Sequence, residues 1–153
     1  MQRVRTAVKA IILHEEQLLC NVYHDERGRY YALPGGGQEY QEDLEEALHR
    51  ECREEISAAV EVHELLFVRD FIGQRNGNLA RLRRMHQLDL FFRCSLQPGE
   101  TPQLGMGADH NQVDVAWVPI GELRPGNFFP YPLVPWLTRL DDPARPVYLG
   151  AVD

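Results

Sequence analysis

Long hydrophobic runs, closely spaced cysteines and an excess of positive charge are all missing from this sequence. No apolar run approaches the roughly 18 residues that a membrane span needs, and the N-terminus lacks the apolar segment and cleavage site of a signal peptide. These absences predict a cytoplasmic protein without a membrane partner. The formal net charge of −7 argues against broad binding to extended nucleic acid.

Cysteine is scarce as well. Cys20, Cys52 and Cys94 are odd in number, widely spaced and surrounded by apolar residues, so we predict reduced core thiols rather than a disulfide or a zinc site. The length of 153 residues and the hydrophobic content of 44% predict one globular domain over residues 1–153. The sequence shows no internal repeat or low-complexity tract.

The most informative stretch is residues 35–58, which read GGGQEYQEDLEEALHRECREEISA. On a helix of about 100° per residue its apolar side chains form one stripe, made of Leu44, Ala47, Leu48, Cys52 and Ile56. Glu51 and Glu54 fall at the edge of the stripe, and Glu55 falls within it. A carboxylate that faces a core is costly unless it is paired, protonated or bound to a metal. Clustered oxygens without thiolates predict Mg²⁺, with Mn²⁺ as the alternative.

The residues before and within this helix predict further contacts. Pro34 and the three glycines after it predict a sharp, exposed turn whose backbone can reach a metal or a phosphate. We expect Glu42 and Asp43 in the first helical turn, where the helix dipole favours negative charge. Arg50 precedes Glu54 by four residues and is expected to orient the carboxylates, the alternative being an exposed salt bridge of little value.

The spacing of these residues resembles the Nudix box of the Nudix (MutT-like) hydrolases. The family pattern is G, five residues, E, seven residues and then REUxEExGU, with U a bulky apolar residue. Here Gly36, Glu42 and residues 50–58 (RECREEISA) match both spacings and every charged position. Cys52 and Ala58 are small for their positions, and Ser57 stands where the family has glycine. That glycine is expected to be a left-handed residue at the helix end, so Ser57 affects the turn rather than the carboxylates.

The resemblance implies an α+β protein with a Nudix-type α/β/α sandwich and a curved mixed β-sheet. It implies a Nudix hydrolase, a pyrophosphohydrolase acting on acid anhydrides. Such an enzyme uses Mg²⁺ to hydrolyse the pyrophosphate bond of a nucleoside diphosphate linked to another moiety. The implied metal ligands are the Gly35 carbonyl, Glu51, Glu54 and Glu55.

Other implied roles are less narrowly assigned. Arg50 orients the carboxylates, Glu42 supports the site, and Glu51 positions or deprotonates the attacking water. The long loop of residues 97–110 is expected to supply a further acid as ligand or base. Asp109 is the first candidate, followed by Glu100 and Asp114.

Apolar alternation elsewhere predicts strands at residues 3–13, 17–23, 30–33, 59–72, 85–96, 113–119 and 147–152. A short helical turn is predicted at residues 120–123 and a final helix at residues 133–140.

Residues 73–84 are predicted to form a loop with a turn at Asn76-Gly77. That loop carries a basic cluster that is either a phosphate or nucleotide clamp or ordinary solvated charge: Arg75, Arg81, Arg83 and Arg84. Three aromatic residues further on either line a base pocket or cover the core: Phe128, Phe129 and Tyr131.

The substrate is narrowed only by elimination. Residues 58–96 contain no proline, which an ADP-ribose pyrophosphatase of this family usually has, and no tyrosine, which a diadenosine-polyphosphate hydrolase has. The coenzyme A marker upstream of the box is also missing. A nucleoside triphosphate, including a damaged one, is therefore favoured. A noncatalytic Nudix module that binds a nucleotide or regulates a partner is the alternative, although the box acids are all present. The sequence leaves a homodimer open.

Overall fold

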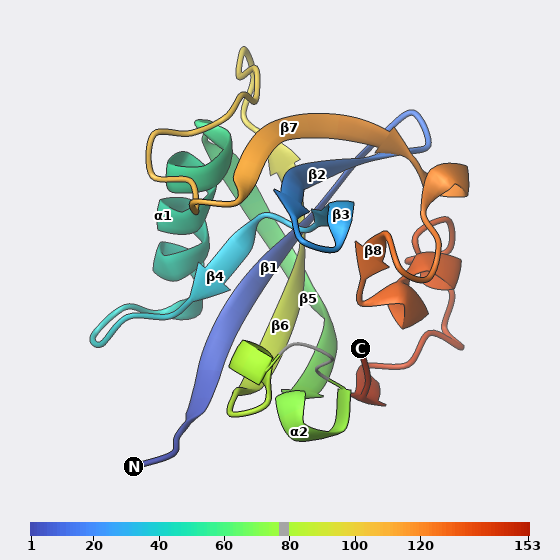
Figure 1. Cartoon of the computed structure of the whole chain (residues 1–153). Helices are drawn as coiled ribbons and strands as arrows, with labels where there is room; N and C mark the ends of the chain where they lie inside the picture. Colours follow the sequence, from blue (N-terminus) through green and yellow to red (C-terminus); the bar gives the residue numbers. More distant parts are fainter. Residues whose placement is uncertain (77–79) are drawn as a thin grey trace.

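The computed structural model describes residues 1–76 and 80–153. Its longer elements are strands β1 (Val4–His14), β2 (Gln17–Asp25), β5 (Val60–Ile72), β6 (His86–Leu96) and β7 (Gln112–Pro119), and helix α1 (Leu44–Ile56) (Figure 1). Shorter elements are β3 (Gly28–Ala32), β4 (Gly35–Gly37), α2 (Gly73–Asn76), β8 (Phe128–Phe129) and β9 (Tyr148–Ala151). Short 3-10 helices lie at Ala80–Leu82, Ile120–Glu122 and Tyr131–Trp136.

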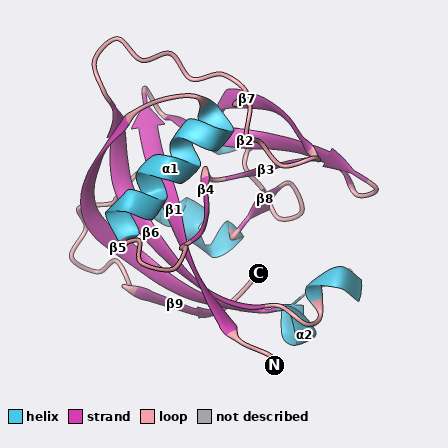
Figure 2. Cartoon of the chain, turned by 90° about the vertical axis from the view of Figure 1, so that its left-hand side faces the viewer, coloured by secondary structure: helices cyan, strands magenta, loops and turns pink. Residues whose placement is uncertain are grey.

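The strands form one curved mixed sheet in the order β8-β3-β2-β1-β6-β5-β9. Strand β1 is parallel to β6 and antiparallel to β2 and β4, and β7 adds to β2. Figure 2 shows α1 lying across one face of this sheet, over β1 and β5. The predicted α+β class with a curved mixed sheet and few helices is confirmed.

The core lies on both faces of β1, which explains why residues 7–12 are apolar except for Lys9. On one face, Val8 and Ile12 pack with Leu48 and Ile56 of α1. On the other face, Ile11 packs with residues that follow β7, among them Leu123, Leu133 and Leu137. The three cysteines are buried and free, as predicted. Helix α1 is therefore anchored on one side only, and its other side is available for a site.

The glycine segment differs from the prediction. Residues 35–37 form strand β4, paired with residues 7–9 of β1, and Gly35 and Gly37 are buried rather than exposed. A Cβ on Gly35 would lie 2.0 Å from the carbonyl oxygen of Val8, and its φ of +144° favours glycine as well. Glycine is required here because two backbones approach closely.

Other predicted elements also shift. The helix predicted at residues 133–140 is wrong: a 3-10 helix occupies Tyr131–Trp136, and Pro135 inside it lacks the amide donor of a regular α-helix. The predicted loop at residues 73–84 contains α2 and a 3-10 turn. The predicted Asn76-Gly77 turn extends beyond the described residues. Bulges after Val62 and Leu65 interrupt the alternation of β5, so that Leu66 and Phe67 are both buried.

Candidate active site

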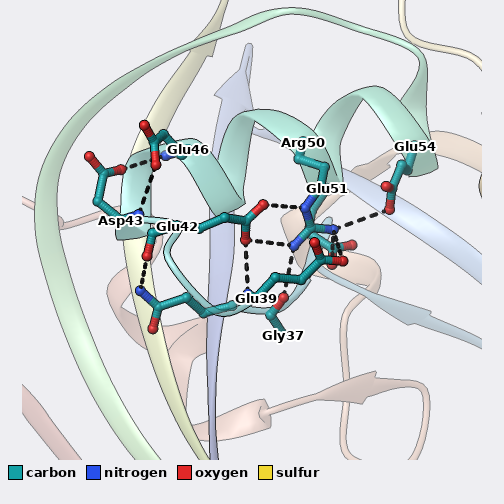
Figure 3. Close-up of polar contacts among 9 residues, drawn as sticks. Gly37, Glu39, Glu42, Asp43, Glu46, Arg50, Glu51 and Glu54 are labelled. Carbon is teal, nitrogen blue, oxygen red and sulfur yellow. Dashed lines mark hydrogen bonds and ion pairs between the residues drawn. The ribbon is translucent and has the colours of Figure 1, made fainter.

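Helix α1 begins with a capping box around Asp43. The Asp43 carboxylate accepts the Glu46 backbone N–H at 2.8 Å, and the Glu46 carboxylate accepts the Asp43 N–H at 2.9 Å (Figure 3). The helix therefore starts at Leu44, and the expectation that Glu42 and Asp43 lie in its first turn is wrong. Glu42 lies before the helix, where its side chain is free to turn toward Arg50.

The end of α1 confirms the expected left-handed residue. Ser57 has φ 52° and ψ 37°, a conformation that favours glycine. Beyond it, the loop of residues 97–110 returns to the helix end. The amides of Gln103, Gly105 and Gly107 donate to the carbonyls of Ile56, Glu55 and Glu54 at 2.9, 3.0 and 3.0 Å. The loop thus satisfies the last carbonyls of the helix and is held against the turn that carries the box acids.

Arg50 is the centre of the polar network on the solvent side of α1 (Figure 3). Its Nε and Nη2 donate to the two carboxylate oxygens of Glu42 at 2.5 and 3.0 Å, and Nη2 also donates to the Gly37 carbonyl at 2.9 Å. Its Nη1 donates to Glu51 at 3.0 Å and to Glu54 at 3.4 Å. The hydrogen bond from Arg50 lowers the pKa of Glu42 to about 2. One planar guanidinium therefore links the glycine strand, Glu42 and two box acids.

Glu55 lies on the buried side of this network. It is 4% exposed, and its Oε1 accepts the backbone N–H of Gly35 at 2.7 Å. Burial raises the pKa of the Glu55 carboxyl to about 7, against the opposing effects of Lys9 and the Gly35 amide. The prediction that Glu55 falls within the apolar stripe is confirmed. A buried acid of this kind changes its charge readily when a cation approaches.

Glu51 lies against the glycine strand. A Cβ on Gly36 would be 2.6 Å from the Glu51 carboxyl carbon, so glycine leaves the room that this side chain occupies. Burial raises the pKa of Glu51, and the hydrogen bond from Arg50 acts in the opposite direction. The glycine at position 36 of the box is therefore required for a steric reason: a larger residue would occupy the place of the Glu51 carboxylate.

These groups line a polar hollow of about 300 Å³, which we call the carboxylate hollow. Its lining consists of Arg5, residues 35–39, Arg50, Glu51, Glu54, Glu55, Gly107 and Asp109. Within residues 1–76 and 80–153, no three acidic, histidine or cysteine side chains already converge as a metal cage. The donor set is nevertheless all oxygen, from carboxylates and a backbone carbonyl, and this set fits a hard divalent cation.

The three candidate loop acids are separated by the fold. Asp109 lines the carboxylate hollow, beside Gly107. Glu100 lines a different hollow with Pro102 and Trp117. Asp114 lies exposed on β7, where its side chain accepts the Val115 N–H at 2.8 Å. The structure brings only Asp109 to the box acids.

A second hollow of about 380 Å³, the central hollow, borders the first at Asp109. Its cationic lining residues are Arg27 and Arg81, and His110 lies beside them. Arg81 belongs to the predicted basic cluster, whose other members are exposed and line neither hollow: Arg75, Arg83 and Arg84. Sequence reasoning overlooked Arg27, although its place in the turn between β2 and β3 is an available signal.

The fold and this hollow together define a hydrolase scaffold built around a carboxylate-bearing helix. The NUDIX domain model matches residues 3–137, and the chain belongs to the Nudix family. The nucleoside triphosphatase NudI of Enterobacter sp. (strain 638) is 45% identical over 122 residues, which cover 76% of this chain and 82% of that protein. The chain is thus a Nudix pyrophosphohydrolase, as the box predicts. Enzymes of this family generally use divalent metal ions and act on nucleotide-linked substrates.

Solved structures agree on the fold. A NUDIX hydrolase from Nitrosomonas europaea superposes with a TM-score of 0.70 at 21% identity, covering 100% of this chain and 80% of that one. A UDP-X diphosphatase gives a TM-score of 0.69 at 20% identity, covering 97% of this chain and 68% of that one. No helix in the described part of the chain has the length and apolarity required to cross a membrane.

Proposed function

We propose that this protein hydrolyses a pyrophosphate bond of a nucleoside triphosphate with the help of Mg²⁺. The observation that carries the proposal is the gathering of Glu51, Glu54 and Glu55 around one hollow that also contains Arg50. The relative at 45% identity is named a nucleoside triphosphatase, which supports this substrate class. The missing markers of other Nudix substrates point the same way.

The metal would be held by the Gly35 carbonyl, Glu51, Glu54, Glu55 and Asp109. Bound there, Mg²⁺ or Mn²⁺ would neutralise charge on the phosphate oxygens and polarise the phosphorus under attack. Glu54 is the most accessible of the three box acids, with 43% of its side chain exposed, whereas Glu51 has 12% exposed. Glu54 therefore faces the incoming substrate, and Glu51 and Glu55 form the inner wall.

The chain's own residues supply the proton transfer. A water oxygen forms a bond to phosphorus while the bridging P–O bond breaks, the phosphate or nucleotide beyond that bond leaves with the bonding electrons, and the water proton passes to a carboxylate. Glu51 is our first candidate base. Burial raises its pKa, which makes its carboxylate a better proton acceptor, and Arg50 holds the side chain in place. Asp109 is the alternative base, since it lines the same hollow from the loop.

Basic residues would bind the phosphates that are not attacked. Arg27 and Arg81 line the central hollow next to Asp109 and can contact a polyphosphate that extends out of the carboxylate hollow. Arg75, Arg83 and Arg84 are exposed nearby in sequence and would act by attracting the anionic substrate to an acidic protein.

The proposal is tested by measuring phosphate and pyrophosphate release from nucleoside triphosphates, sugar nucleotides and dinucleotides, with and without Mg²⁺ or Mn²⁺. We expect metal-dependent turnover that is fastest with a nucleoside triphosphate. Glu54→Gln and Glu55→Gln should each lose most turnover and remain folded. Wild-type turnover in either variant, or turnover that is independent of metal, contradicts the assignment.

A further inference from the structure

A third hollow, of about 230 Å³, adjoins the central hollow and has no lining residue in common with the carboxylate hollow; we call it the aromatic pocket. Its apolar lining consists of Tyr30, Ala32, Phe71, Leu82, Met85 and Phe129. It shares Arg27, Tyr30 and Leu82 with the central hollow, which in turn shares Asp109 with the carboxylate hollow. The three hollows therefore follow one another along the protein surface.

The walls of the aromatic pocket suit a flat ring. Tyr30 and Phe129 meet edge to face, with ring centroids 6.1 Å apart and planes at 76°. Tyr23 stacks behind Tyr30 at 5.3 Å with planes at 12°, and the Arg27 guanidinium lies 4.2 Å from the Tyr30 ring centroid. These contacts fix the orientation of Tyr30, and they place a cation where the aromatic pocket opens into the central hollow.

The polar lining residues are Arg27, Arg69, Gln87 and Asp153, and two of them, Arg69 and Gln87, hold the buried Asp89 behind the pocket wall. Arg69 donates through Nε and Nη2 to Oδ2 of Asp89 at 3.0 and 2.5 Å, and Asp89 is fully buried. Gln87 donates through Nε2 to the other oxygen of Asp89 at 2.7 Å. Because that oxygen accepts, the amide orientation of Gln87 is settled, and its carbonyl Oε1 points away from Asp89.

This carbonyl is left without a protein partner. Gln87 lines the aromatic pocket, and no hydrogen bond found within residues 1–76 and 80–153 ends on its Oε1; this oxygen is not among the enclosed unpaired atoms of the fold, so it is open to the pocket. A carbonyl oxygen that is open to a pocket and has no partner in the protein can accept an N–H of a bound ligand. A flat ligand with an N–H on its edge meets both requirements of the pocket.

We propose that the aromatic pocket binds the nucleobase of the substrate, with the ring held by Tyr30, Phe71 and Phe129 and a base N–H donating to Oε1 of Gln87. The volume is below that of pockets for drug-sized ligands and suits a single base. The phosphates then pass Arg27 and Arg81 and reach the carboxylate hollow. This inference rests on the proposed function and adds to it the site that selects the base.

The experiment compares Gln87→Met, which keeps the side-chain length and removes the acceptor, with the wild type. We expect KM for the preferred nucleoside triphosphate to rise about tenfold, the size of one lost hydrogen bond in a buried site, with little change in kcat. Inorganic tripolyphosphate carries the phosphates without a base, so its inhibition constant as a competitor should not change. Gln97→Met, directly after the other end of β6, is the matched control and should behave as wild type.

Phe129→Leu is the second variant, because Gln87→Met also removes a donor to Asp89 and can lower stability. It should raise KM for nucleotides and leave tripolyphosphate inhibition unchanged. An unchanged nucleotide KM in this variant and in folded Gln87→Met overturns the inference while the proposed function stands. If the wild type turns over no nucleotide, the proposed function fails. In that case, isothermal titration calorimetry with nucleoside monophosphates tests the pocket. Binding to the wild type that is weaker in Phe129→Leu supports the inference, and no binding to the wild type overturns it.

Discussion

Arg50 and Glu42 form a two-point ion pair across the start of helix α1, with N–O distances of 2.5 and 3.0 Å. The pair fixes the plane of the guanidinium, and the remaining donors of Arg50 then point to the Gly37 carbonyl, Glu51 and Glu54. A residue outside the helix thus determines where two box acids lie. The first prediction tests this arrangement.

Arg50→Lys should reduce kcat/KM by about 10- to 100-fold, the usual cost of losing a group that orients site ligands. An ammonium keeps the charge but cannot bind Glu42 at two points and reach Glu51 as well. Steady-state kinetics at saturating Mg²⁺ measure the loss. Arg53→Lys, on the exposed face of the same helix, is the control and should keep wild-type kinetics. Equal activity in the two variants contradicts the orienting role.

Glu55 makes stability depend on pH. Its pKa is raised from 4.5 to about 7 by burial, so the folded state holds this proton more tightly than the unfolded state. The stabilisation is fully present below pH 4.5 and is lost as pH rises toward 7, by about 3 kcal/mol in total without metal. Chemical denaturation at several pH values measures it. Glu55→Gln, which keeps an acceptor for the Gly35 amide, should show a flatter profile over this range.

A divalent cation should offset the loss of stability that ionisation of Glu55 causes at high pH. Because a cation favours the ionised carboxylates, Mg²⁺ should raise the melting temperature at pH 8 more than at pH 5. Differential scanning calorimetry with Mg²⁺ and with chelator measures the difference. Glu54→Gln and Glu55→Gln should each reduce the shift caused by Mg²⁺. If both variants showed the same Mg²⁺-dependent shift in melting temperature as the wild type, the cation would bind outside the carboxylate hollow.

Gly36→Ala should damage activity more than stability. The added methyl group would lie 2.6 Å from the Glu51 carboxyl group, and the side chain of Glu51 has to move out of its position to make room. We expect at least a tenfold fall in kcat and a small change in melting temperature, since the displaced atoms are the end of a flexible chain. Gly121→Ala is the control because its new Cβ meets nothing within 4 Å.

Ser57→Gly should stabilise the fold by about 1 kcal/mol. Ser57 is the left-handed residue at the end of α1, a conformation that costs a non-glycine residue about 1–2 kcal/mol, partly offset by the greater freedom of glycine in the unfolded chain. The change restores the Nudix box pattern. Urea denaturation measures the gain, and kcat should stay unchanged because Ser57 does not line the carboxylate hollow. A loss of stability would mean that the serine hydroxyl has a stabilising partner.

Local patterns predicted the helix and its acids well. The 3.6-residue periodicity of α1 was enough to place Glu55 toward the core, because a helix has one geometry and its apolar stripe has one partner. The strands β1, β5 and β6 were predicted within a few residues from their apolar content. The segment around residues 131–140 was harder: Pro135 lies inside the expected last helix, which is a 3-10 helix, and pattern alone does not distinguish the two.

Contacts between distant residues were not predictable. The bidentate contact of Arg50 with Glu42 spans eight positions and depends on how the chain enters the helix. The ion pair of Arg69 with Asp89 depends on the register of β5 against β6, which two bulges shift. Tyr23 and Tyr30 are directly paired in the β2–β3 hairpin, and that pairing was within reach of hairpin reasoning.

The amides of Gln103, Gly105 and Gly107 donate to three successive carbonyls at the end of α1, so the register of the loop along the helix is fixed by hydrogen bonds. These hydrogen bonds involve backbone atoms only. Substitution of the exposed side chains at positions 101, 103, 104 and 106 therefore leaves the register of the loop on the helix unchanged. Deletion of one residue between Gly107 and Asp109 would instead pull the acid back along the helix by about one residue length. The loop is therefore tolerant in composition and strict in length.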